Sequence, residues 1–154
     1  MKLKKHSKIL IGIVVAVLLL TGITAGYLQS YYHTDTQAVS AYQYKQNSDT
    51  KIQTKMLSDG SIVCEPENPA AGFIFYPGGK VETSAYEPLM QACAAQDILC
   101  VLVSMPFHLA VFDKNAADGI QEQYPQIDSW YIGGHSLGGA MAASYVSKHA
   151  DSFD

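Results

Sequence analysis

The sequence predicts an α/β protein built on a mostly parallel sheet with helices on both faces. A short, uniformly apolar segment at 72–76 is typical of a strand that is buried on both sides, and we interpret 98–103 and 127–132 as two further buried strands. Loops and segments with helical spacing alternate with them, which favours parallel strands joined by helical connections. A strand–turn–strand pattern at 51–64 precedes them and predicts an antiparallel edge.

The composition limits the class of partner before any motif is considered. The chain has 154 residues, enough for one modest domain, and a net charge of −4. It contains no arginine, and its first eight residues hold four lysines, Lys2, Lys4, Lys5 and Lys8. Because a basic, arginine-rich surface is absent from this sequence, we expect no nucleic-acid partner.

Residues 1–28 have the pattern of a signal anchor. Basic residues precede an uncharged apolar run at 9–28, and about twenty such residues span a bilayer as a helix. The positive-inside rule then predicts a single-pass protein of the cell membrane, with the bilayer as the partner of 9–28 and the remainder outside the cytoplasm. The alternative is secretion after cleavage of a signal peptide, although the apolar core of such peptides usually has ~7–15 residues.

The segments between the apolar run and the predicted sheet are polar. We interpret 29–50 as a stalk with one short helix near 36–45, because it holds few large aliphatic side chains. A hairpin follows, with alternating polar and apolar residues at 51–56 and an Asp59-Gly60 pair at its turn.

Two helices are expected between the apolar strands. The first strand ends at the loop 77–80, and Ser84 with Glu87 then forms a capping-box pattern that predicts a helix starting near Ser84. After the second strand, a weak amphipathic pattern at 115–124 predicts another helix, which ends before Pro125.

The three cysteines, Cys64, Cys93 and Cys100, have neither the C-x-x-C spacing nor that of a zinc site. We expect Cys93 and Cys100 to be small core residues, because both lie among apolar neighbours. An odd number leaves at least one thiol unpaired outside the cell, and a disulfide between two of them stays open.

The third apolar strand leads into Gly134-His135-Ser136-Leu137-Gly138, which reads G-x-S-x-G. A strand, this tight turn and then a small-residue helix at 140–146 form the context of a nucleophile elbow, in which a serine hydroxyl projects above the sheet. Gly134 and Gly138 stand where strand and helix backbones come too close for a side chain. A tight packing turn or a phosphate cradle is the alternative, but the spacing fits neither common nucleotide motif.

Three stretches, in this order and spacing, resemble the α/β-hydrolase superfamily. They are 72–82 (GFIFYPGGKVE), 105–112 (MPFHLAVF) and 130–142 (WYIGGHSLGGAMA). The likeness is greatest to a bacterial group with one membrane anchor. It implies an α/β-hydrolase-type sheet and a serine hydrolase that acts on an ester or related acyl bond of a small substrate, with no metal or cofactor.

The resemblance also implies residue roles. Ser136 would be the nucleophile, and Leu137, as the residue after it, would donate its backbone N–H to the oxyanion. The second donor would come from the loop after the first core strand, at Gly79 or Lys80, and the choice between the two stays open.

The sequence departs from this superfamily after the elbow. The family order places an acid and then a histidine downstream of the serine, whereas His149 is only thirteen positions beyond Ser136, about 20 Å along the same predicted helix. We therefore expect 51–154 to be the N-terminal part of a hydrolase domain, truncated after the elbow helix and inactive alone. Trp130 and Ile132 would then lie on an unpaired sheet edge. The alternative is a non-catalytic, membrane-anchored fragment or binding half-domain.

Overall fold

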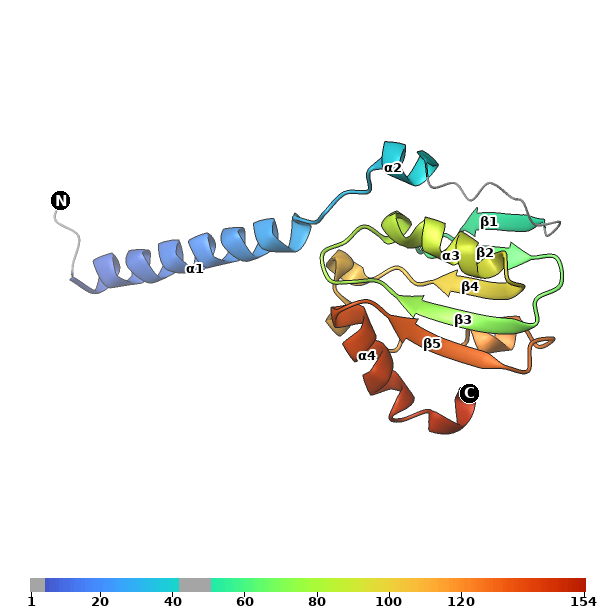
Figure 1. Ribbon diagram of the computed structural model, residues 1–154. Helices are drawn as coiled ribbons and strands as arrows, with labels where there is room; N and C mark the ends of the chain where they lie inside the picture. Colours follow the sequence, from blue (N-terminus) through green and yellow to red (C-terminus); the bar gives the residue numbers. More distant parts are fainter. Residues whose placement is uncertain (1–4, 42–50) are drawn as a thin grey trace. The chain divides into compact units, whose positions relative to one another are not determined.

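The computed structural model describes residues 5–41 and 51–154. The chain divides into two compact units, Met1–Tyr31 and Tyr32–Asp154. The first unit holds helix α1 (Lys5–Gln29), which is long and apolar enough to cross a membrane (Figure 1). This length and composition fit a single-pass anchor and also a signal peptide. Two of the N-terminal lysines, Lys2 and Lys4, and residues 42–50 of the expected stalk lie outside the described residues.

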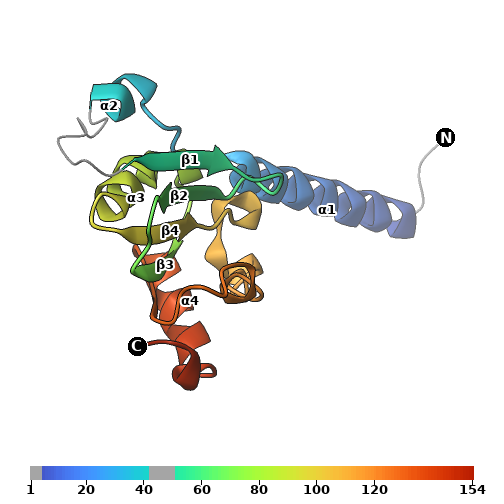
Figure 2. The same cartoon turned by 90° about the vertical axis from the view of Figure 1, so that its right-hand side faces the viewer.

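The second unit contains a five-stranded sheet in the order β1-β2-β4-β3-β5 (Figure 1), and Figure 2 shows β1, β2, β4 and β3 from another side, following one another in that order. The strands are β1 (Ile52–Met56), β2 (Ile62–Pro66), β3 (Ala71–Tyr76), β4 (Ile98–Leu102) and β5 (Trp130–Gly134). Strands β4, β3 and β5 run parallel, whereas β1 and β2 form an antiparallel hairpin that pairs with β4. The predicted α/β architecture and its antiparallel edge are confirmed.

The hairpin turn owes its shape to two adjacent residues. Gly60 has φ +86°, a conformation that costs glycine little, and the Asp59 carboxylate accepts hydrogen bonds from the Ser61 amide (2.9 Å) and hydroxyl (3.0 Å). The Ser61 hydroxyl in turn accepts the amide of Ser104, just beyond β4 (3.0 Å). The turn is therefore fastened to the parallel part of the sheet.

A helix covers each face of the sheet, as predicted. Helix α3 (Glu87–Ala94) buries Met90 and Ala94 in a cluster with apolar side chains of β2, β3 and β4. Helix α4 (Leu137–Val146) buries Ala142 and Tyr145 in the cluster of the opposite face. The alternation of side chains along each strand separates the two clusters.

The expected capping box is wrong. A 3₁₀ helix (Thr83–Tyr86) precedes α3, which starts at Glu87 without a side-chain cap. The Glu87 carboxylate instead accepts a hydrogen bond from the Gln91 side chain (2.9 Å), and the Ser84 hydroxyl pairs with that of Thr34 (2.7 Å). Both side chains that the local pattern assigned to the cap therefore make other hydrogen bonds.

The helix expected at 115–124 is also wrong, because only a 3₁₀ turn (Gln121–Gln123) forms there. The buried Tyr76 hydroxyl accepts the Ala117 amide (3.0 Å) and donates to the Lys114 carbonyl (2.9 Å). Gly119, with φ +72°, breaks the helical path two residues later. The short helix expected near 36–45 is present as α2 (Thr36–Ala41), and the rest of that range lies outside the described residues.

Candidate active site

The junction between β5 and α4 has the geometry of a nucleophile elbow. Ser136, between the end of β5 and the first residue of α4, has φ 50° and ψ −119°. A side-chain-bearing residue rarely adopts such a positive φ, and surrounding structure must hold it there. The serine is exposed, and its hydroxyl makes no hydrogen bond to another described residue.

Two glycines let the backbone close around this serine. A Cβ on Gly134 would lie 2.6 Å from the Tyr76 carbonyl oxygen, and one on Gly138 would fall on the carbonyl oxygens of Tyr76 and Pro77. The His135 amide donates to the Tyr76 carbonyl at 3.1 Å, so the end of β3 is packed directly under the turn. Because these obstacles are backbone atoms, only glycine fits at either position.

Two backbone amides beside the serine are unoccupied among the described residues, those of Leu137 and Gly79. Leu137 is the first residue of α4, whose N-terminal amides point out of the helix. Gly79 follows β3, and a Cβ built on it would lie 3.0 Å from Leu137 Cδ2. Leu137 and Gly79, which the sequence analysis predicted as oxyanion donors from two different elements, are therefore neighbours. The Leu137 N–H, at the N-terminus of a helix, is suited to negative charge.

Lys80 has a different environment from Gly79. Its amide donates to the His108 carbonyl at 2.6 Å, and its own carbonyl accepts the Tyr32 amide at 2.7 Å. Its φ of 61° turns the chain sharply away from β3. Of the two candidates for the second donor, Lys80 has its N–H engaged by another loop.

A comparison with protein families finds one match in this part of the chain. A model of the alpha/beta hydrolase family matches residues 72–154, which run from β3 to the last residue. The chain belongs to the alpha/beta hydrolase family. A search of curated proteins finds no match. Family membership supports a hydrolase-type function with a small-molecule substrate.

The histidine of the elbow takes part in a network that the sequence did not predict. In this hydrolase the Gly78 amide donates to the Tyr86 hydroxyl oxygen (3.1 Å), which lies 2.8 Å from Nδ1 of His135. With its oxygen accepting from Gly78, the Tyr86 hydroxyl has its proton free to donate to His135. The network ties the loop after β3 to the elbow. Tyr86 carries no sequence signal, since it is a single tyrosine beside a helix start.

The other nearby histidines are held elsewhere. His149 follows the end of α4 rather than continuing it; its Nδ1 lies 2.9 Å from the Tyr145 carbonyl, and its ring stacks on that of Tyr145 at 4.1 Å. It lines a cavity of about 240 Å³ together with Asp118, whose carboxylate accepts the Tyr145 hydroxyl at 2.7 Å. Burial lowers the pKa of His108, in the loop after β4. Within the described ranges no histidine is hydrogen-bonded to Ser136, and no group of three metal-ligand side chains forms.

Proposed function

We propose that this protein is a serine hydrolase that cleaves an ester or related acyl bond with Ser136 as its nucleophile. The observation that supports it best is the positive φ of an exposed serine between a parallel strand and a helix, flanked by two obligatory glycines. Strain of this kind is retained where it serves a function, and here it presents a hydroxyl above the sheet.

The proposed reaction uses two backbone donors. Ser136 Oγ attacks the acyl carbon and loses its proton to a base, while the carbonyl oxygen becomes an oxyanion that accepts from Leu137 and Gly79 N–H. Collapse expels the alcohol and leaves an acyl-serine, which water then hydrolyses to release the acid. We favour Gly79 over Lys80 because the Lys80 amide already donates to His108. One such donor typically lowers the barrier by about 3–4 kcal/mol.

Among the described residues, no histidine is hydrogen-bonded to Ser136 as its general base would be. His135 Nδ1 is engaged by Tyr86, and His149 Nδ1 lies against the Tyr145 carbonyl. A serine hydroxyl without an adjacent base is a weak nucleophile. We therefore expect acylation of Ser136 in this chain to be slow in plain buffer and to accelerate when a small base is added.

The test is acyl transfer from a 4-nitrophenyl ester, with and without imidazole, followed by peptide mass spectrometry. The expected result is an imidazole-dependent acyl adduct on Ser136 that is absent from Ser136→Ala. Ser147, an exposed serine that follows α4, is the matched internal control for non-specific acylation. Equal modification of Ser136 and Ser147 would overturn the proposal and favour the non-catalytic alternative.

We further propose that residues 9–28 anchor the protein in the cell membrane, with the hydrolase unit outside the cytoplasm. The 25-residue helix α1 and the lysines before its apolar run support this orientation. Protease added to intact cells should remove the region beyond Tyr32 and leave a membrane-bound stub. Protection until lysis would contradict the orientation, and a mature protein in the medium would indicate signal-peptide cleavage instead.

A further inference from the structure

A short segment that is distant in sequence lies along the loop that carries Gly79. The Tyr32 amide donates to the Lys80 carbonyl at 2.7 Å, and the Glu82 amide donates back to the Tyr32 carbonyl at 3.0 Å. These bonds make Tyr32 a parallel β-bridge partner of Val81. An isolated β-bridge at Tyr32 thus joins residues 32–34 to the segment 80–82.

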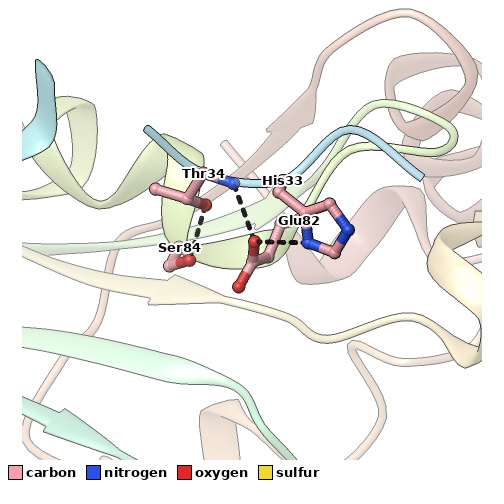
Figure 3. Close-up of polar contacts among 4 residues, drawn as sticks. All are labelled: His33, Thr34, Glu82 and Ser84. Atoms are coloured by element: carbon pink, nitrogen blue, oxygen red, sulfur yellow. Dashed lines mark hydrogen bonds and ion pairs between the residues drawn. The ribbon is translucent and has the colours of Figure 1, made fainter. Parts of the chain in front are cut away.

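Side chains strengthen this pairing on the next two residues (Figure 3). The Thr34 amide donates to Glu82 Oε2 at 2.7 Å, and His33 Nδ1 lies 3.8 Å from the same oxygen. The hydroxyls of Thr34 and Ser84 are 2.7 Å apart. One carboxylate therefore receives both a backbone amide and a histidine from the segment 32–34.

The two peptide units on either side of the Lys80 Cα are each hydrogen-bonded to a different segment. On one side its carbonyl accepts the Tyr32 amide, and on the other its N–H donates to the His108 carbonyl. The Gly79 N–H belongs to the Gly78–Gly79 peptide, whose carbonyl accepts the Val81 amide at 3.3 Å, so fixing the segment 80–82 also restricts the orientation of this peptide. An oxyanion donor is effective only when it is aimed before the reaction begins.

We propose that residues 32–34 are a positioning segment, which docks on Glu82 and Ser84 to fix the loop 77–82 and thereby aims the Gly79 amide at the oxyanion. This inference rests on the proposed function and adds a part outside the family match, which starts at residue 72. In the described part of the chain, this segment makes no hydrogen bond to Ser136. The segment affects the orientation of one donor, the Gly79 N–H. Its loss should therefore be measured as a lower rate of oxyanion formation.

The test compares two reactions of one nucleophile. In a Ser136→Cys chain at pH 9, a thiol of ordinary pKa, about 8.5, is ionised without a protein base. Acylation by a 4-nitrophenyl ester develops an oxyanion, whereas alkylation by iodoacetamide displaces iodide and develops none. The rate constant of acylation divided by that of alkylation, both at position 136, therefore measures how much the oxyanion donors accelerate the reaction. The accessibility of the thiol and its ionised fraction affect both rate constants and cancel in the ratio. Peptide mass spectrometry separates this site from the three native cysteines.

Glu82→Ala, added to this chain, removes the acceptor of the Thr34 amide. We expect the ratio to fall about tenfold, less than the 10²–10³ of a deleted donor, while alkylation stays within about twofold. Glu82→Gln keeps an acceptor oxygen and should restore most of the ratio. Glu65→Ala, which removes the exposed Lys55–Glu65 pair (3.1 Å) of the hairpin, is the matched control and should leave it unchanged.

The outcomes separate the two proposals. A parent ratio no higher than that of a small free thiol would contradict the oxyanion site itself, and with it the proposed function. A raised parent ratio that Glu82→Ala leaves unchanged would overturn only the positioning role of residues 32–34. That role would also be overturned if Glu82→Gln behaved like Glu82→Ala, or if acylation and alkylation fell together.

Discussion

At the scale of single residues, the elbow depends on backbone clearance more than on side-chain chemistry. Gly138 illustrates this, because the atoms that a Cβ would meet belong to the main chain of Tyr76 and Pro77 and have no rotamer by which to move away. Gly133, in β5 just before the turn, provides a contrast, since its Cβ would meet only the edge of the Phe73 ring, at 3.2 Å. A flexible neighbour can give way by a few tenths of an ångström, whereas a backbone carbonyl cannot.

Gly138→Ala should therefore lower the free energy of unfolding by about 3 kcal/mol or more, the upper part of the range for overpacking. Gly133→Ala should cost about 1 kcal/mol or less, because the Phe73 ring can shift. Urea denaturation followed by tryptophan fluorescence measures both, since Trp130 lies in β5. Equal stabilities for the two variants would contradict the close approach of β3 to the elbow.

The cysteines differ in predicted reactivity for physical reasons. The neighbouring Cys100 thiol lowers the pKa of half-buried Cys93, whereas burial raises the pKa of Cys64 to about 11. At pH 7.5 iodoacetamide should label Cys93 first, roughly three- to tenfold faster than a thiol of ordinary pKa. Cys100→Ala should slow the labelling of Cys93. Faster labelling of Cys64 would show that these environments are wrongly described.

At the scale of secondary-structure elements, local patterns predicted those parts whose geometry is set by neighbours in sequence. The G-x-S-x-G turn and the Asp59-Gly60 hairpin are of this kind, because their glycines answer local steric demands. The helix expected at 115–124 failed because the hydroxyl of Tyr76, forty-one positions before Ala117, takes the amide that a helix would use. No local pattern records that contact.

The candidate site divides in the same way. Ser136 and its glycines were predictable from the motif, whereas the preference for Gly79 over Lys80 rests on a hydrogen bond to His108 in another loop. Tyr86 and the segment 32–34 were missed for the same reason. Both are held by hydrogen bonds between segments that are distant in sequence and meet only in the tertiary fold.

The pairing of 32–34 with the loop should depend on pH in one direction. The hydrogen bond from the Thr34 amide, aided by Ser84 and His33, lowers the pKa of Glu82 below its ordinary 4.5. A depressed carboxyl pKa stabilises the docked segment above pH 4.5, and this stabilisation is lost as the pH falls through the lower, folded-state value. The Thr34 amide chemical shift should report undocking below pH 4.5 and should not titrate in Glu82→Gln. A transition above pH 4.5 would give the opposite sign and contradict the contact.

At the scale of the whole hydrolase unit, the two edges of the sheet are protected unequally. The expectation that Trp130 is unpaired is wrong: Asp154 donates its amide to the Trp130 carbonyl (2.9 Å), and its carboxylate accepts the Trp130 amide (3.2 Å). Ile132 is the next residue of β5 whose backbone N–H and C=O point away from β3, because alternate residues of β5 bond to β3. Among the described residues, these two groups of Ile132 have no hydrogen-bond partner.

This asymmetry predicts where the unit self-associates. Edge strands without charge recruit other chains, and lysine on an edge discourages pairing. The opposite edge strand, β1, carries Lys55, whereas β5 has no charged residue and exposes Tyr131 by 45%. We therefore expect residues 29–154 to aggregate and to bind a hydrophobic dye, with β5 as the contact.

Tyr131→Lys should reduce that association, because the exposed ammonium opposes the approach of a second edge while the backbone pairing with β3 is unchanged. Met56→Lys on β1 is the matched control, since Met56 is even more exposed, at 69%, on an edge that already carries a lysine. Sedimentation velocity at rising concentration gives the measurement. If Met56→Lys restores a monomer and Tyr131→Lys does not, the copies associate through the β1–β2 hairpin, and the prediction that β5 is the contact edge is wrong.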